Sequence, residues 1–115
     1  GNGRTHVQVI LGIQGRDLYL VVSGGEAHVG AVAVWDARNP DAPPVVNELP
    51  GHKEGPLAGA CAEIVGRITG RTVAVVAGIH QDHATRGEIE TIVANAKQAA
   101  RQAAEAFKAK ERSRR

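Results

Sequence analysis

The sequence predicts an α+β fold: a single, mostly antiparallel sheet of about five strands with two helices, the C-terminal one long. Three observations lead to this prediction. Apolar residues alternate along residues 6–13, as they do in a strand with one buried face. An uninterrupted apolar run fills residues 73–79 and is typical of a buried strand. Apolar residues then recur at helical spacing in residues 56–69 and again in residues 86–110.

Turn signals divide the rest of the sheet into strands. Residues 14–17 form a short turn of the hairpin kind, and the glycine-rich stretch 23–30 and the proline-rich stretch 37–44 form loops. The strands between them are predicted at residues 6–13, 18–22, 31–36, 45–49 and 72–79. The strand at 45–49 suits only an edge of the sheet, because prolines flank it.

Both predicted helices carry recognisable start and stop signals. Pro56 suits the first position of the first helix, and Gly70 suits its C-terminal stop. The second helix opens with a capping box, in which Thr85 and Glu88 satisfy backbone N–H groups at the helix start. At ~1.5 Å per residue this helix is ~35–40 Å long, which is longer than a small domain needs.

The length of 115 residues predicts one domain, 1–115, with a core at about 5–107 and a basic tail at 108–115 that we expect to fray. The tail holds five basic residues against one acidic residue, so the formal net charge of +2 arises there, and the remainder is slightly acidic. This distribution argues against a nucleic-acid partner, which needs basic residues on a folded face. Only three aromatic residues help to fill the core, so oligomer contacts are a plausible further source of burial.

The cysteine count and the hydropathy of the sequence indicate the cellular compartment. The single cysteine, Cys61, excludes an intrachain disulfide and a multi-cysteine metal cluster. We find no signal peptide and no apolar run near the length of a membrane span, so we expect a cytoplasmic protein without a membrane partner.

Strand direction predicts that several loops share one edge of the sheet. If the first strand points up, the second points down, the third up and the fourth down. A helix crossover then makes the fifth strand point down as well. The lower ends of the second, fourth and fifth strands lead into loops that carry His28, His52 and His80, and both helices begin at this edge. Ligands of open α/β sheets bind beyond such strand ends.

These residues have a plausible chemistry. Three neutral imidazoles with an open position suit zinc or a similar first-row metal, so His28, His52 and His80 are candidate ligands. Gly24 and Gly25 allow backbone to approach a ligand closely, and Lys53 offers a charge for a phosphate. The acidic residues of the same loops, Glu26, Glu54 and Asp82, could orient a metal-bound imidazole, whereas His83 is expected to face solvent. Each histidine could equally be an ordinary polar loop residue.

The ordered set of these segments resembles the prenylated-flavin chaperone family (LpdD-like), whose members accompany gallate-type decarboxylases that use prenylated FMN. The resemblance covers about residues 6–95 and rests on Gly-Arg-Asp-Leu-Tyr-Leu-Val-Val-Ser-Gly-Gly (15–25), Ala-His-Val-Gly (27–30), Gly-His-Lys-Glu (51–54), Val-Val-Ala-Gly-Ile-His (75–80) and Thr-Arg-Gly-Glu-Ile (85–89). It implies a fold similar to that of proteasome-assembly chaperones and a homodimer.

The resemblance also implies a function. A non-enzymatic chaperone would hold prenylated FMN, or FMN, with a divalent metal such as zinc or manganese near the phosphate, and deliver it to a UbiD-type decarboxylase. Carried over to this sequence, the cofactor-binding candidates are Gly24, Gly25, His28, His52, Lys53 and His80, and the metal candidates are His28, His52 and His80.

Two alternatives from other functional classes remain open. The long, alanine-rich second helix would suit an assembly or accessory subunit that binds protein without any cofactor. A three-histidine site would suit a small metal-dependent phosphate-ester hydrolase, although the sequence offers no obvious general acid–base pair.

Overall fold

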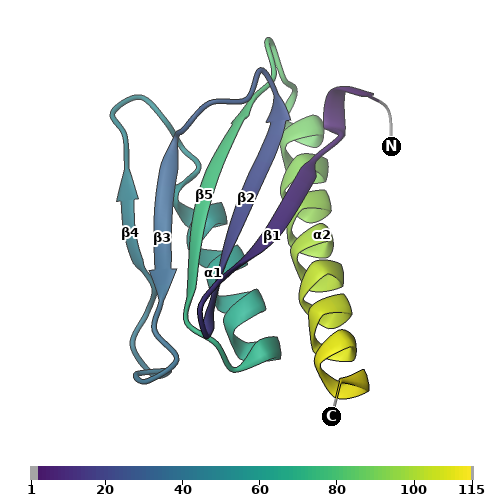
Figure 1. The fold of residues 1–115 in the computed structure, drawn as a ribbon. Helices are drawn as coiled ribbons and strands as arrows, with labels where there is room; N and C mark the ends of the chain where they lie inside the picture. Colours follow the sequence, from purple (N-terminus) through teal and green to yellow (C-terminus); the bar gives the residue numbers. More distant parts are fainter. Residues whose placement is uncertain (1–2, 115) are drawn as a thin grey trace.

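Five strands form one sheet in the order β1-β2-β5-β3-β4 in the computed structural model, which describes residues 3–114 (Figure 1). A 3-10 turn, η1 (Gly3–Thr5), precedes the first strand. The strands are β1 (Gln8–Gln14), β2 (Asp17–Gly25), β3 (Ala31–Trp35), β4 (Val45–Glu48) and β5 (Val73–His80). The helices are α1 (Gly55–Thr69) and α2 (Arg86–Ser113).

The strand directions agree with those predicted from the sequence. β1 pairs with β2 antiparallel, and β3 is antiparallel to both β4 and β5. β2 and β5 form the one parallel pair, so β2, β4 and β5 all point the same way. The α+β fold class, with a mostly antiparallel sheet and a long C-terminal helix, is confirmed.

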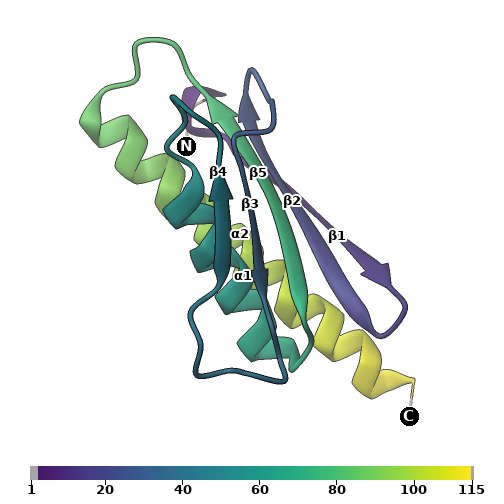
Figure 2. The same ribbon diagram turned by 90° about the vertical axis from the view of Figure 1, so that its left-hand side faces the viewer.

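Both helices lie on the same side of the sheet (Figures 1 and 2). α1 packs beneath β3 and β5, and α2 packs against α1 and β1. The alternate strand residues that face the helices are buried, and they form the core with one stripe of α1 and the alanines of α2. Gly66 lets Trp35 lie against α1, because a Cβ at this glycine would fall 2.1 Å from Cε3 of the indole.

The helix boundaries follow the signals in the sequence. Gly70 ends α1 in the left-handed region, with φ of 72°. The capping box at α2 is complete, because the Thr85 hydroxyl accepts from the Glu88 N–H and the Glu88 carboxylate accepts from the Thr85 N–H. α2 continues to Ser113, three residues beyond the predicted end at Lys110, and Glu111 in this last turn forms an ion pair with Arg71.

The predicted glycine-rich loop begins later than expected. Ser23, Gly24 and Gly25 are not a turn but the last three residues of β2, and they pair with residues 78–80 of β5. Parallel pairing along the full length of β5 keeps Ser23 and Gly24 in the strand, and only Gly25 takes a left-handed conformation where the strand ends. Within residues 3–114, no helix combines the length and hydrophobicity that crossing a membrane requires.

Candidate functional site

One edge of the sheet collects the ends of β2, β4 and β5 and the starts of both helices (Figure 2). His28 lies in the connection from β2 to β3, and His52 lies between β4 and α1. His80 is the last residue of β5. The strand directions therefore bring the three predicted histidines to the same end of the molecule.

Two of these histidines converge with a glutamate. Nε2 of His28 lies 3.1 Å from Nδ1 of His52 and 2.8 Å from Oε2 of Glu54. Nδ1 of His52 lies 3.8 Å from Oε1 of the same carboxylate. One ligand atom from each residue falls within 4.8 Å of the others, which is a grouping that can hold a metal ion. We call these three residues the His-His-Glu cluster.

The surrounding backbone fixes Glu54 at the centre of this cluster. Its carboxylate accepts hydrogen bonds from the N–H groups of Lys53 and Ile79, and the side chain is only 11 % exposed. Gly30 makes this position available, because a Cβ there would lie 2.1 Å from Oε2 of Glu54. Gly78 makes room for the backbone of the His28 loop, since its Cβ would collide with the His28 carbonyl.

The hydrogen bond at the far side of the His28 ring determines its tautomer. Nδ1 lies 3.1 Å from the carbonyl oxygen of Glu26, and a carbonyl can only accept. Nδ1 therefore carries the proton, and a neutral ring presents the lone pair of Nε2 to Glu54.

His80 lies beside the cluster rather than in it. Its ring centroid is 6.3 Å from that of His28, in an edge-to-face arrangement. Its Nε2 lies 2.7 Å from Oδ1 of Asp82, and both side chains are more than half exposed. The ring would have to turn away from Asp82 to add a further nitrogen to the cluster.

A groove of about 500 Å³ connects these residues to the starts of the two helices. One wall is polar and carries His28, His52, Lys53, Glu54 and His80. The aliphatic part of the lining, which we call the aliphatic wall, consists of Leu57, Ile79, Ile89, Ile92 and Val93. Ile89 is 51 % exposed there, which is high for an isoleucine on the sheet-facing half of a helix.

The other predicted residues occupy different places. Gly24 and Gly25 do not line the groove; Gly24 abuts Ile79, and Gly25, with φ of 59°, lies against the carbonyl of His80. His83 is exposed and adopts a left-handed backbone conformation with φ of 52°, as suits a turn.

Sequence reasoning missed the aliphatic wall and understated Glu54. These aliphatic residues also belong to the buried stripes of the helices and to β5, and among the five only Ile89 is exposed. Glu54 was expected to orient a ligand, whereas it lies within ligand distance itself. Its position directly before Gly55 and Pro56 was the available signal, because a residue at a helix start has its side chain next to the loops of the same edge.

The ionisable groups with a clear pKa shift lie outside the groove. The hydrogen bond from Arg4 and one from the Thr85 backbone lower the pKa of Glu88 from 4.5 to about 2. Burial raises the pKa of the Cys61 thiol to about 11, so this cysteine is an inert core residue.

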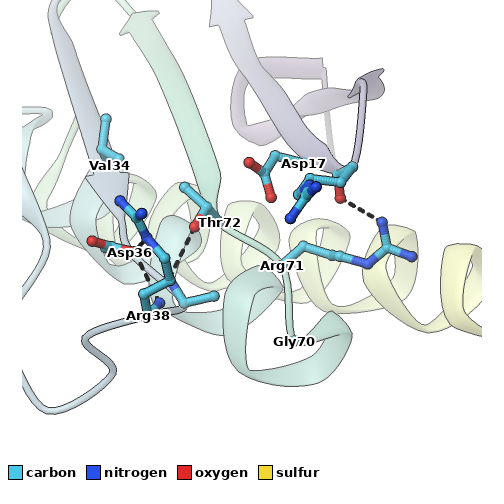
Figure 3. Close-up of a pocket in the computed structure, with 9 residues that line it drawn as sticks. Asp17, Val34, Asp36, Arg38, Gly70, Arg71 and Thr72 are labelled. Atoms are coloured by element: carbon cyan, nitrogen blue, oxygen red, sulfur yellow. Dashed lines mark hydrogen bonds and ion pairs between the residues drawn. The ribbon is translucent and has the colours of Figure 1, made fainter.

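A larger hollow of about 830 Å³ lies at the opposite end of the sheet (Figure 3). Its border carries charges of both signs, from Arg16, Asp17, Asp36, Arg38 and Arg71. Arg71 donates to the Arg16 carbonyl and pairs with Glu111, and Asp36 accepts from the Arg38 N–H. The hollow therefore carries arginines and aspartates together rather than charges of a single sign.

Comparison with known proteins identifies the family of this chain. No curated protein matches the chain. Residues 1–108 match the family described as the prenylated flavin chaperone LpdD-like domain, which covers nearly all of the 115 residues. The match includes every residue of the groove and of the His-His-Glu cluster, and the chain therefore belongs to the prenylated flavin chaperone LpdD-like family.

Proposed function

We propose that this chain binds prenylated FMN in the groove at the edge of the sheet and delivers it to a UbiD-type decarboxylase, without catalysing a reaction itself. Membership of a prenylated flavin chaperone family indicates the class of cofactor. The observation that carries the proposal is that one groove is lined both by aliphatic side chains and by imidazoles, a carboxylate and a lysine. The proposed transfer takes place in the cytoplasm.

The aliphatic wall suits the ring system of the cofactor. A prenylated flavin is a flat, largely apolar group, and binding sites for such groups are lined mainly by apolar side chains with a few convergent polar ones. Leu57, Ile89, Ile92 and Val93 provide this surface on the two helices, with Ile79 of β5 beside them. Covering the ring on this wall would also limit its access to oxygen.

The polar wall suits the phosphate and a divalent metal. Zinc binds histidine nitrogen and carboxylate oxygen at ~2.0–2.2 Å, so atoms that share one tetrahedral ion lie ~3.3–3.5 Å apart. The two imidazole nitrogens, 3.1 Å apart, are close to this range, and they approach different oxygens of Glu54, at 2.8 and 3.8 Å, so small side-chain rotations would bring one oxygen to both. A metal-bound histidine commonly donates its other N–H to a backbone carbonyl, as Nδ1 of His28 does to Glu26.

The cluster residues would hold such an ion, and it would supply positive charge for a phosphate oxygen. Lys53 would add a point charge at the exposed side of the groove. In this proposal Glu54 joins His28 and His52 as a ligand. His80 keeps its predicted role as a further ligand or cofactor contact, which requires its ring to turn from Asp82.

The proposal is tested by anaerobic titration with reduced prenylated FMN, with and without zinc or manganese. We expect saturable binding that tightens when the metal is present. The absence of saturable binding under both conditions would contradict the proposal. Transfer is tested by adding apo-decarboxylase to the loaded protein and measuring the appearance of decarboxylase activity.

Matched histidine variants test the site. His28→Ala and His80→Ala should each weaken binding at least tenfold, which corresponds to ~1.4 kcal/mol. His83→Ala is the control, because His83 is an exposed histidine of the same edge that does not line the groove. Equal effects at His80 and His83 would remove His80 from the site.

A second candidate function follows from the carboxylate next to two imidazoles, an arrangement that also suits metal-assisted hydrolysis of a phosphate ester. Turnover on a panel of phosphate esters with added zinc or manganese would favour it. Absence of turnover, together with cofactor binding, would favour the carrier.

A further inference from the structure

The two edges of the sheet differ in how they are protected. A free edge strand presents unpaired N–H and C=O groups to other chains, and proteins commonly protect such edges with prolines, charges, bulges or short strands. β4 is protected in this way, because it is only four residues long, follows Pro43 and Pro44, and ends at Glu48. β1 is seven residues long, and Gln8–Gln14 contains no proline and no charged residue. It pairs with β2 residue for residue, without a bulge.

The turn after β1 determines which of its backbone groups face outwards. Gln14 and Asp17 close a two-residue turn, so they exchange both backbone hydrogen bonds of the ladder. Bonded pairs alternate along an antiparallel ladder, so the N–H and C=O groups of Val9, Leu11 and Ile13 point away from β2. Within residues 3–114, these groups have no backbone partner in another segment. They form a row of donors and acceptors along the outer edge of β1 (Figure 1).

A cleft of about 300 Å³ lies beside this edge, between β1 and the last turns of α2, and we call it the edge cleft. Its apolar lining consists of Leu11, Ile13, Ala103, Ala106 and Phe107. Ile13 is 61 % exposed, although its side chain lies on the helix-bearing face of the sheet. A strand added beside β1 would place alternate side chains in this cleft, where they would cover Ile13.

The charges at the edge cleft favour an acidic occupant. Lys110 and Arg114 belong to its lining and are exposed. The acidic residue of the lining, Glu111, pairs with Arg71, whereas neither Lys110 nor Arg114 forms an ion pair within residues 3–114. Two positive charges therefore face an incoming chain. A second copy of β1 would bring no carboxylate to meet them, because β1 has no acidic residue.

We propose that the edge of β1 is a docking site for an extended, acidic segment of a partner protein. This segment pairs with β1 as a further strand, and its alternate apolar side chains fill the edge cleft. Main-chain hydrogen bonds supply the affinity in this mode of recognition, and pockets for alternate side chains supply the specificity. The edge cleft shares no lining residue with the groove, so the proposal does not depend on cofactor binding.

The probe is a capped, fluorescein-labelled peptide about as long as β1, in which valine alternates with threonine and glutamates stand at both ends. Fluorescence anisotropy measures its dissociation constant. We expect saturable binding that is much tighter than binding of the same peptide with lysines at its ends. Hydrogen exchange of the Val9, Leu11 and Ile13 N–H groups should slow when the peptide binds. Absence of saturable binding, or equal binding of the two peptides, would contradict the proposal.

Ile13→Pro tests the main-chain pairing. The N–H of Ile13 lies outside the ladder with β2, and an edge strand tolerates proline where the lost N–H faces outwards, so we expect this variant to fold. Its affinity for the glutamate peptide should fall at least ~10-fold, because one hydrogen bond is lost and the proline ring obstructs the added strand. Ile13→Val is the matched control, because it keeps the N–H, and it should bind as the wild type does. Equal binding by both variants would exclude strand addition.

A charge reversal on α2 gives a readout that leaves β1 unchanged. The double variant Lys110→Glu, Arg114→Glu should lose the glutamate peptide and bind the lysine peptide instead. Arg101→Glu is the control, since Arg101 is an exposed arginine of α2 outside the edge cleft, and it should leave both affinities unchanged. A preference for the glutamate peptide that survives the reversal would overturn the assignment of an acidic partner.

Sedimentation velocity without peptide tests the other occupant of this edge. The mass of Ile13→Pro should equal that of the wild type. A lower mass for Ile13→Pro would show that a second copy pairs with β1, and it would overturn the proposal.

Discussion

Glu54 is the residue on which the proposed metal site depends most. It bridges two imidazoles and is held by two backbone N–H groups, so its carboxylate is positioned before any ligand arrives. We predict that Glu54→Gln weakens zinc binding at least tenfold, or ~1.4 kcal/mol, because a neutral amide replaces an anionic ligand.

Equilibrium dialysis with metal analysis measures this change. Glu63→Gln is the control, because Glu63 is an exposed glutamate of α1 that pairs with Arg67 away from the groove. The same loss of affinity in both variants would show that net charge, and not the cluster, governs metal binding.

A second prediction at the residue scale concerns acid stability. The pKa of Glu88 falls from 4.5 to about 2 in the folded chain, chiefly because Arg4 donates a hydrogen bond to it. A carboxyl group with a lowered pKa stabilises the fold above pH 4.5, and this contribution is lost as the pH falls through about 2. Arg4→Ala should move the pKa of Glu88 back towards 4.5 and make stability less dependent on pH across that interval.

Carboxyl carbon NMR of Glu88 follows the first effect, and chemical unfolding at several pH values follows the second. Arg86→Ala serves as the control, since Arg86 is an exposed arginine that pairs with Glu90 instead. An unchanged Glu88 pKa in Arg4→Ala would contradict this prediction. It would mean that the hydrogen bond from the Thr85 backbone, the second cause, lowers the pKa instead.

At the scale of elements, the contact between α1 and β3 depends on a missing side chain. Gly66→Ala should gain ~1 kcal/mol of helix propensity but lose ~1–3 kcal/mol to overpacking, because its Cβ would lie 2.1 Å from the buried Trp35 ring. The ring cannot move into the close-packed core, so we predict net destabilisation. Gly87→Ala in α2 meets only one atom, at 4.0 Å, and should be neutral or stabilising.

Urea unfolding at a fixed protein concentration, followed by the fluorescence of the single tryptophan, compares the two variants. Stabilisation by Gly66→Ala would mean that α1 can shift away from β3 at little cost.

The elements that the sequence predicted well are those with local signals. Alternation defined β1, the capping box defined the start of α2, and Gly70 defined the end of α1. The extension of β2 through Gly25 and the insertion of β5 between β2 and β3 could not be predicted, because both depend on pairing between distant segments.

The candidate site also could be predicted only in part from the sequence. Strand direction brought His28 and His52 to one edge, but the approach of Glu54 depends on space that Gly30 leaves, which no periodicity indicates.

At the scale of the whole molecule, the sheet has one covered face and one open face. The helices bury the inner residues of the strands, whereas Val32, Val34 and Ala74 face outwards from the centre of the sheet. A chain with three aromatic residues draws little stability from large core side chains. The homodimer that the family resemblance implies would add a second apolar layer if it packed on the open face, and folding and association should then be coupled.

This coupling makes the unfolding temperature depend on protein concentration. When a folded dimer unfolds to two separate chains, mass action favours the dimer as concentration rises, so Tm should increase across a hundredfold concentration series. Calorimetry of the wild type measures this shift. Val34→Lys places a charge on the open face and should unfold at a lower Tm that no longer depends on concentration. Ile13→Lys is the control, because Ile13 is an exposed residue on the helix-bearing face, and this variant should retain the dependence. A wild-type Tm that stays constant across the series would mean that the open face contributes nothing to stability, because a monomer unfolds at the same temperature at every concentration.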